Sequence, residues 1–194
     1  LRRSSAASDV YKRQAQQIKP LKAQLDYIQS LPKPLIAVID LLAQGKLVKA
    51  EQICKLFLQK NPRNVEGMRL LSQIALKLGV LDDAEFLLES ALEFSPNNSR
   101  IRIEYIQVLR KRQNYAGALH QAKVLLEMDK ENPQFQSVFA IEAMQSGDFE
   151  NALIVFDKIL EKIPEDPVTL TSRGHLLKTC GEREKAIDSY RSCL

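Results

Sequence analysis

The sequence predicts an all-α fold in which pairs of antiparallel helices stack into an α-solenoid. Three observations lead to this prediction. Alanines recur at a fixed spacing of 34 residues, at Ala50, Ala84, Ala118, Ala152 and Ala186. Between them, apolar residues fall at helical spacing, with no alternation of strand and helix patterns. A helix pair of this size has too little core to fold alone, so neighbouring pairs must stack to bury a continuous core.

Two further positions of the period mark where each helix ends. The boundary between the two helices of a unit lies five residues before the alanine, at Gly45, Gly79, Gln113, Gly147 and Gly181. Glycine tolerates the positive φ with which a helix commonly ends. The second helix is followed in three units by a proline, at Pro62, Pro96 and Pro164. Proline cannot continue the helical hydrogen-bond ladder, and the small alanine lets the second helix approach the first closely.

These units resemble the tetratricopeptide repeat (TPR) family over residues 31–194. The best of them read VEGMRLLSQIALKLGVLDDAEFLLESALEFSPNN and PQFQSVFAIEAMQSGDFENALIVFDKILEKIPED. The resemblance implies a right-handed solenoid of helix-turn-helix repeats at 31–64, 65–98, 99–132, 133–166 and 167–194. The pattern departs at Pro32 and Pro34 in the first unit, and at Gln113 and Lys130 in the third. The last unit stops inside its second helix, so the natural protein is expected to continue.

The N-terminal segment needs a separate explanation. Residues 4–14, SSAASDVYKRQ, resemble the conceptual translation of a transposon adaptor used in sequencing libraries. On this interpretation residues 1–14 are a disordered artefact, the true start is unknown, and the chain is a fragment assembled from environmental DNA. A natural, polar N-terminus is the alternative. Residues 1–14 carry a net charge of +3 out of the total of +4, which leaves the rest of the chain nearly neutral.

Residues 15–30 also lie outside the period. Leu21, Leu25 and Ile28 share one helical face, which predicts a short helix after Pro20. We expect this helix to cap the apolar first unit, as terminal segments of repeat arrays do. An independent binding role is the alternative.

The composition excludes several classes of protein. Hydrophobic content of 45% and charged content of 27% are ordinary for a soluble folded chain. No apolar run approaches the ~20 residues of a membrane-spanning helix. Three cysteines without a CxxC pair and two histidines do not suit a structural zinc site, and the sparse thiols favour a reducing, cytoplasmic location. Cys54 and Cys193 lie on apolar stripes and are predicted to be buried, inert thiols.

No catalytic constellation is found in the sequence. There is no GxxxxGK[ST] phosphate loop, no GxGxxG and no HExxH helix. His120 and His175 are interpreted as ordinary surface or packing histidines. We therefore predict no catalytic residue, no cofactor and no metal ligand within these 194 residues.

The candidate site comes from the family resemblance. In TPR proteins the first helix of each unit lines a concave groove that holds an extended peptide or a partner helix. Carried over position by position, the resemblance implies these groove residues: Arg69, Gln73, Lys77, Arg100, Gln107, Arg110, Lys111, Ile141, Met144, His175 and Lys178. The same faces also carry Glu66, Leu76, Ile103, Gln134, Ser137, Gln145, Val168, Thr171 and Thr179.

Six of these groove positions are Lys or Arg and only Glu66 is acidic. A locally positive groove would capture an acidic segment or a terminal carboxylate. The alternative is a solvated helix face, because cations such as Arg110 and Lys111 are favoured at a helix C-terminus. The family's chaperone-tail carboxylate clamp uses asparagines at positions where this chain has Gln73, Gln107, Ile141 and His175, so that clamp is not expected. Nucleic-acid binding is not expected, because aromatic residues are only 6% of the chain and none interleave the basic positions.

The sequence therefore predicts a protein–protein interaction scaffold without catalysis of its own. The competing hypothesis is the N-terminal repeat arm of a larger enzyme. The final unit, SRGHLLKTCGEREKAIDSYRSCL, is similar to the last repeats of bacterial TPR–sulfotransferase proteins, and part of it also resembles repeats beside O-GlcNAc transferase domains. The resemblance to TPR–sulfotransferase proteins implies a catalytic domain beyond residue 194, which would bind the donor 3′-phosphoadenosine 5′-phosphosulfate.

Overall fold

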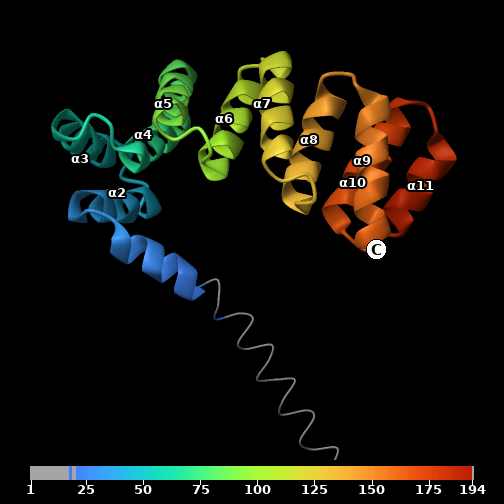
Figure 1. Cartoon of the computed structure of the whole chain (residues 1–194), viewed down its shortest axis with the longest axis horizontal. Coiled ribbons are helices and arrows are strands. Elements are labelled where there is room, and N and C mark those ends of the chain that lie inside the picture. The colour runs from blue at the N-terminus through green and yellow to red at the C-terminus, as the bar shows by residue number, and fades with distance from the viewer. Residues whose placement is uncertain (1–17, 19–20, 194) are drawn as a thin grey trace, which may run out of the picture. The chain divides into compact units, whose positions relative to one another are not determined.

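The computed structural model describes residue 18 and residues 21–193, which form two compact units, Leu1–Pro62 and Arg63–Leu194. Throughout these described residues the chain is helical or lies in short connections between helices (Figure 1). The all-α fold class is therefore confirmed. The adaptor-like segment, residues 4–14, lies outside the described residues.

The first unit contains one helical pair and the helix that precedes it. Residues 21–30 are helical, and the pair consists of α2 (Lys33–Ala43) and α3 (Leu47–Lys60). Leu35 and Val38 of α2 are completely buried. Leu21 and Leu25, which were expected to cap this unit, are exposed, and Ile28 is half-buried. The expected capping contact is thus missing at both leucines, while the central apolar residues of α2 are covered without them.

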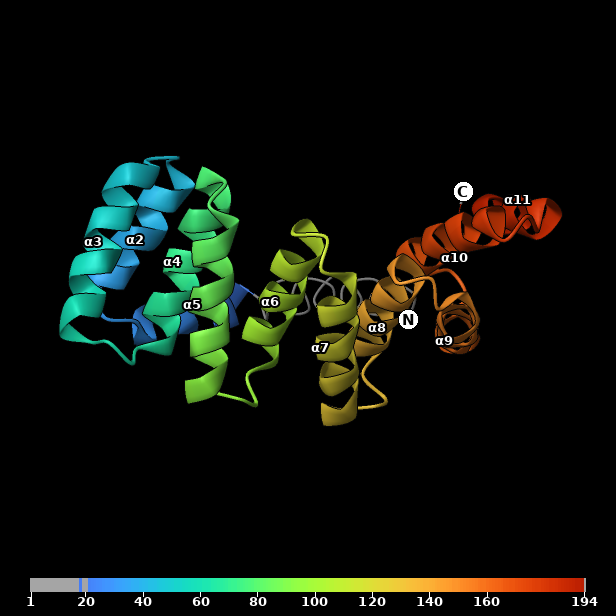
Figure 2. The same ribbon diagram turned by 90° about the horizontal axis from the view of Figure 1, so that it is seen from above.

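The second unit contains four successive helical pairs. Its helices are α4 (Val65–Leu78), α5 (Leu81–Phe94), α6 (Ser99–Lys111), α7 (Tyr115–Met128), α8 (Pro133–Gln145), α9 (Phe149–Lys162), α10 (Pro167–Thr179) and α11 (Arg183–Arg191). Each first helix begins 34 residues after the previous one, and so does each second helix. Every helix packs against its neighbours in chain order, as Figures 1 and 2 show. This sequential stacking is the architecture of an α-solenoid.

The position between the two helices of a pair has a left-handed backbone in all five pairs. The φ angles are positive at Gly45, Gly79, Gly147 and Gly181, and also at Gln113, where φ is 61°. A helix that ends with one residue in this conformation satisfies its last carbonyl groups, as in the bond from Val80 N–H to the carbonyl of Ala75, at 2.9 Å. The conformation belongs to the position in the repeat, even where glycine is absent.

The periodic alanines lie at the contact between paired helices. Ala50, Ala84, Ala118, Ala152 and Ala186 are all buried. Because the buried alanine side chain is small, the two helices of each pair can approach closely. A core of leucine, isoleucine and phenylalanine, such as Leu70, Leu88 and Phe156, fills the remaining space.

A further periodic position caps the first helices of the second unit. The side chains of Asn64, Asn98, Asn132 and Asp166, again 34 residues apart, accept hydrogen bonds from backbone N–H groups in the first turns of α4, α6, α8 and α10. These groups would otherwise lack a partner within the helix. By contrast, Asp148 and Glu182, the residues that directly precede α9 and α11, make no capping hydrogen bond with their side chains.

The described helices are all too short or too polar to cross a membrane. Among the described residues there is also no cluster of three or more metal-ligating side chains.

Candidate functional site

A groove runs across three successive first helices of the second unit. It has a volume of about 480 Å³ and is called the central groove below. Its lining residues come from α4, α6 and α8 and are Gln73, Leu76, Ser99, Arg100, Ile103, Glu104, Gln107, Gln134 and Phe135. Helices of one kind line it because the 34-residue repeat places the same face of each first helix on the same side of the stack.

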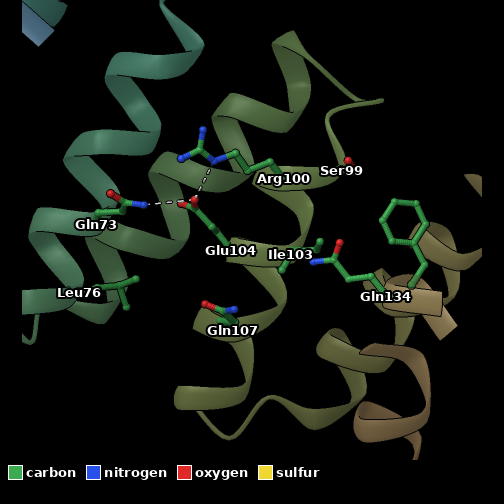
Figure 3. Close-up of a pocket in the computed structure, with 9 residues that line it drawn as sticks. Gln73, Leu76, Ser99, Arg100, Ile103, Glu104, Gln107 and Gln134 are labelled. Carbon is green, nitrogen blue, oxygen red and sulfur yellow. Dashed lines mark hydrogen bonds and ion pairs between the residues drawn. The ribbon is translucent and has the colours of Figure 1, made fainter. Parts of the chain in front are cut away.

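The central groove combines an apolar floor with amide groups. Leu76 and Ile103, which form this floor, are half-buried; Figure 3 shows Leu76 near Gln73 on α4 and Ile103 on α6 beside the side chain of Gln134. A glutamine amide can both donate and accept hydrogen bonds. An extended peptide needs both kinds of partner, because its main chain alternates N–H and carbonyl groups. The groove therefore offers hydrogen-bond donors and acceptors beside apolar side chains.

Glu104 organises the charges at one side of the groove. Its Oε1 atom accepts hydrogen bonds from Nη1 of Arg69 at 2.8 Å and from Nε2 of Gln73 at 3.2 Å, and Nε of Arg100 lies 3.7 Å away (Figure 3). Arg69 also donates from Nε to Oε1 of Glu66, at 2.8 Å. The Oε2 atom of Glu104 is buried without a hydrogen-bond partner among the described residues.

Arg69 is not the exposed groove cation that its sequence position suggested. Its side chain is only 2% exposed and lies between Glu66 and Glu104. Two carboxylates beside one buried guanidinium offset its positive charge, and a buried, paired arginine cannot contact a ligand directly. Its role in the structure is to join α4 to α6 through Glu104.

Arg110 is likewise paired with a carboxylate. Its Nη1 atom lies 3.0 Å from Oε1 of Glu142, a residue of α8 that is 2% exposed. Burial raises the pKa of Glu142, and the positive charge of Arg110 opposes that shift. The Oε2 atom of Glu142 has no partner among the described residues. The pair joins α6 to α8. Because Glu142 offsets the charge of Arg110, the groove is less positive than the sequence suggested.

The remaining candidates are distributed along the array. Lys77 and Lys111 are exposed in the last turns of α4 and α6. Ile141 and Met144 are half-buried on α8, outside the lining of the central groove, and Lys178 is exposed near the end of α10. The structure thus brings Gln73, Arg100 and Gln107 together, but not these five.

His175 contacts the second helix of its own pair. Its ring lies edge-on to that of Tyr190, with 5.6 Å between centroids, and its Nδ1 atom is 3.1 Å from the Tyr190 hydroxyl. It therefore helps to join α10 to α11. The neighbouring Gly174 is required there too, because a Cβ atom at this position would overlap the Tyr190 ring.

Sequence reasoning missed the two carboxylates that neutralise the groove cations. Glu104 follows Arg100 by four residues, and this spacing on a helix is a recognised signal of an ion pair. Glu142 carried no such signal, because its partner Arg110 lies in the preceding repeat. The two cysteines expected to be inert differ: Cys54 is buried, which raises its pKa to about 12, while Cys193 is half-buried.

Comparison with known proteins places this site in a family context. Residues 55–169 match the family described as the cytochrome c-type biogenesis protein H TPR domain, and these residues include the whole central groove. No curated protein sequence matches the chain.

Several solved structures share the fold. MamA from Desulfovibrio magneticus RS-1 superposes with a TM-score of 0.73 at 14% identity, over 82% of this chain and 90% of that one. YrrB, described as a TPR protein with an unusual peptide-binding site, superposes with a TM-score of 0.69 at 17% identity, over 89% of each chain. At these identities the likeness shows the fold alone.

Proposed function

The chain belongs to the TPR family described as the cytochrome c-type biogenesis protein H TPR domain, and we propose on this premise that its central groove binds an extended segment of a partner protein. The observation that carries the proposal is the composition of the groove. Three glutamines line it together with the half-buried Leu76 and Ile103, on three helices that the repeat holds at fixed positions. This arrangement suits main-chain hydrogen bonding together with burial of an apolar side chain.

The charge of the partner is part of the same proposal. Arg69 and Arg110 are paired with carboxylates of the chain itself. Fewer cations are therefore available to attract an acidic partner than the sequence suggested. Lys77 and Lys111 remain exposed at the C-terminal ends of α4 and α6. We expect any acidic residue of the bound segment to contact these two lysines, and the floor of the groove to select by shape and hydrogen bonding instead.

Catalysis is not part of the proposal. The family match and the structural neighbours concern the repeat array, and they lend no support to a sulfotransferase or other transferase beyond residue 194. A cytoplasmic location is likewise only an expectation from the sparse cysteines.

The proposal is tested with a library of random ten-residue peptides and the whole chain. Bound peptides are identified and their Kd values are measured by fluorescence polarisation. In the double variant Gln107→Ala/Gln134→Ala we expect Kd to rise by about ten- to a hundredfold. Each lost hydrogen bond contributes roughly 0.5–1.5 kcal/mol, and every 1.4 kcal/mol corresponds to about tenfold in affinity.

A matched control separates groove contacts from general damage. His120 and Lys123 are exposed on α7, a second helix, and do not line the central groove. The double variant His120→Ala/Lys123→Ala should bind like the unmodified chain. Equal losses in both double variants, or no captured peptide at all, would contradict the proposal.

A further inference from the structure

A second, smaller hollow adjoins the central groove at Gln134. It has a volume of about 280 Å³ and lies between α8, α9 and α10. Gln134 lines both the central groove and this space, which is called the apolar hollow below. A segment bound in the central groove and continuing past Gln134 therefore reaches the apolar hollow next.

The walls of the apolar hollow are mainly aliphatic. Val138, Ile159, Ile163 and Val168 contribute side chains from three helices and the residue that follows α9. The volume lies just below the ~300–1,000 Å³ typical of sites for drug-sized ligands. A single side chain is thus a more suitable occupant than a cofactor.

This apolar surface is left uncovered by the described residues. Val168 is 59% exposed, and Ile163 is also exposed. A cluster of exposed aliphatic residues that line a concave surface is typical of a binding site. Thr169, which also lines the hollow, is buried, and its Oγ1 atom has no hydrogen-bond partner among the described residues. The hollow therefore offers mainly apolar contact to an occupant.

From this continuity we infer that the apolar hollow is a specificity subsite, which takes one aliphatic side chain of the segment held in the central groove. The inference rests on the proposed function and adds a chemical requirement to it. The preferred ligand is an extended peptide with Leu, Ile, Val or Met at the position that follows the part bound at Gln134. An acidic side chain at that position is excluded, because the aliphatic walls would leave it without a partner and the carboxylate of Asp166, which also lines the hollow, would repel it.

The test uses the whole chain and a positional-scanning library of ten-residue peptides. We expect enrichment of Leu, Ile, Val or Met at one position of the bound peptides. With the variant Val168→Asp, the Kd of an enriched peptide should rise at least tenfold. Val168 occupies the first turn of α10, where an acidic residue is compatible with the helix, so this variant should stay folded.

A matched variant and a matched peptide make the measurement specific. Ile154 on α9 is 57% exposed and does not line the apolar hollow, so Ile154→Asp should leave the Kd within twofold. A peptide with alanine at the enriched position should bind the unmodified chain and Val168→Asp equally well. This double-mutant cycle isolates the contact between the side chain and the hollow.

Three other outcomes of these measurements would overturn the inference, and they can be told apart. If peptides bind without an aliphatic preference, or if both Asp variants weaken binding equally, the subsite is disproved and the proposed function stands. Failure to bind any peptide removes the proposed function and the subsite together. If light scattering shows a dimer that Val168→Asp converts to a monomer, the hollow holds a second copy of the chain instead.

Discussion

Gln113 occupies the turn position where the other four pairs have glycine, and it adopts the same left-handed backbone. For a residue with a Cβ atom this conformation costs roughly 1–2 kcal/mol. The surrounding stack therefore holds Gln113 in a conformation that its own preference opposes. The repeat geometry outweighs the local cost, so the departure in sequence causes no departure in structure.

This residue yields a direct test of backbone strain. Replacing Gln113 with glycine should raise the free energy of unfolding by about 0.5–1 kcal/mol, because relief of strain exceeds the extra chain entropy of glycine. The reverse change, Gly79→Gln, should lower it by a similar amount. A Cβ atom at Gly79 meets no other atom within 4 Å, so any loss there arises from the backbone alone.

The measurement is urea unfolding followed by circular dichroism at 222 nm. We expect Gln113→Gly to raise the free energy of unfolding and Gly79→Gln to lower it. Destabilisation by both changes would show that the Gln113 side chain contributes contacts that matter more than its strain.

At the scale of the helix, the start of each first helix in the second unit depends on one capping side chain. Asn98 illustrates the arrangement: its Oδ1 atom accepts a hydrogen bond from the N–H of Ile101, at 3.2 Å. Because α4, α6, α8 and α10 start in the same way, the caps set where each groove-lining helix begins. They therefore also set which residues of that helix reach the groove.

Removing one cap should weaken the array measurably. The substitution Asn98→Ala is expected to lower the free energy of unfolding by about 1 kcal/mol, whereas Asn98→Asp should keep most of it, because aspartate caps equally well. Asn97→Ala is the matched control, since Asn97 is adjacent and exposed. A loss with Asn97→Ala as large as that with Asn98→Ala would contradict a capping role.

At the scale of the whole chain, stability in the second unit depends on contacts between successive helices. Each helix packs mainly on the helix before it and the helix after it. Such arrays behave as linear chains of coupled units, and they open first where coupling between neighbours is weakest. The packing of α10 on α9 is sparser than that of α6 on α5 or of α8 on α7.

This difference predicts the order of local opening. In native-state hydrogen exchange, the amides of α10 and α11 should exchange together and at least tenfold faster than those of α6 and α7. Peptide-resolved mass spectrometry would measure both regions in one sample. Equal protection of the two regions would show that the second unit unfolds as a single cooperative body.

Much of the fold could be predicted because it depends on local and periodic properties. The helix boundaries follow from glycine, proline and alanine positions such as Gly79, Pro96 and Ala84, whose effects act within a few residues. The groove face followed from the family resemblance, and Gln73, Gln107 and Gln134 do line the central groove. These predictions needed only the spacing within one repeat.

The charge of the groove could not be predicted in the same way. It depends on partners such as Glu104 for Arg69 and Glu142 for Arg110, which lie 35 and 32 residues away on neighbouring helices. The expected cap formed by residues 15–30 failed at Leu21 and Leu25 for a related reason, since helical amphipathicity does not say which surface a face will meet.

By itself, the sequence determined an all-α repeat array, the ends of its helices and the face that forms the groove. These properties depend on backbone preferences and on a period that each unit repeats. Only the tertiary structure decided which cations of that face remain exposed, that Gln134 lines both the central groove and the apolar hollow, and which carboxylate oxygens have no partner among the described residues. Those properties arise where side chains of different repeats meet, at distances that no spacing within a single repeat can specify.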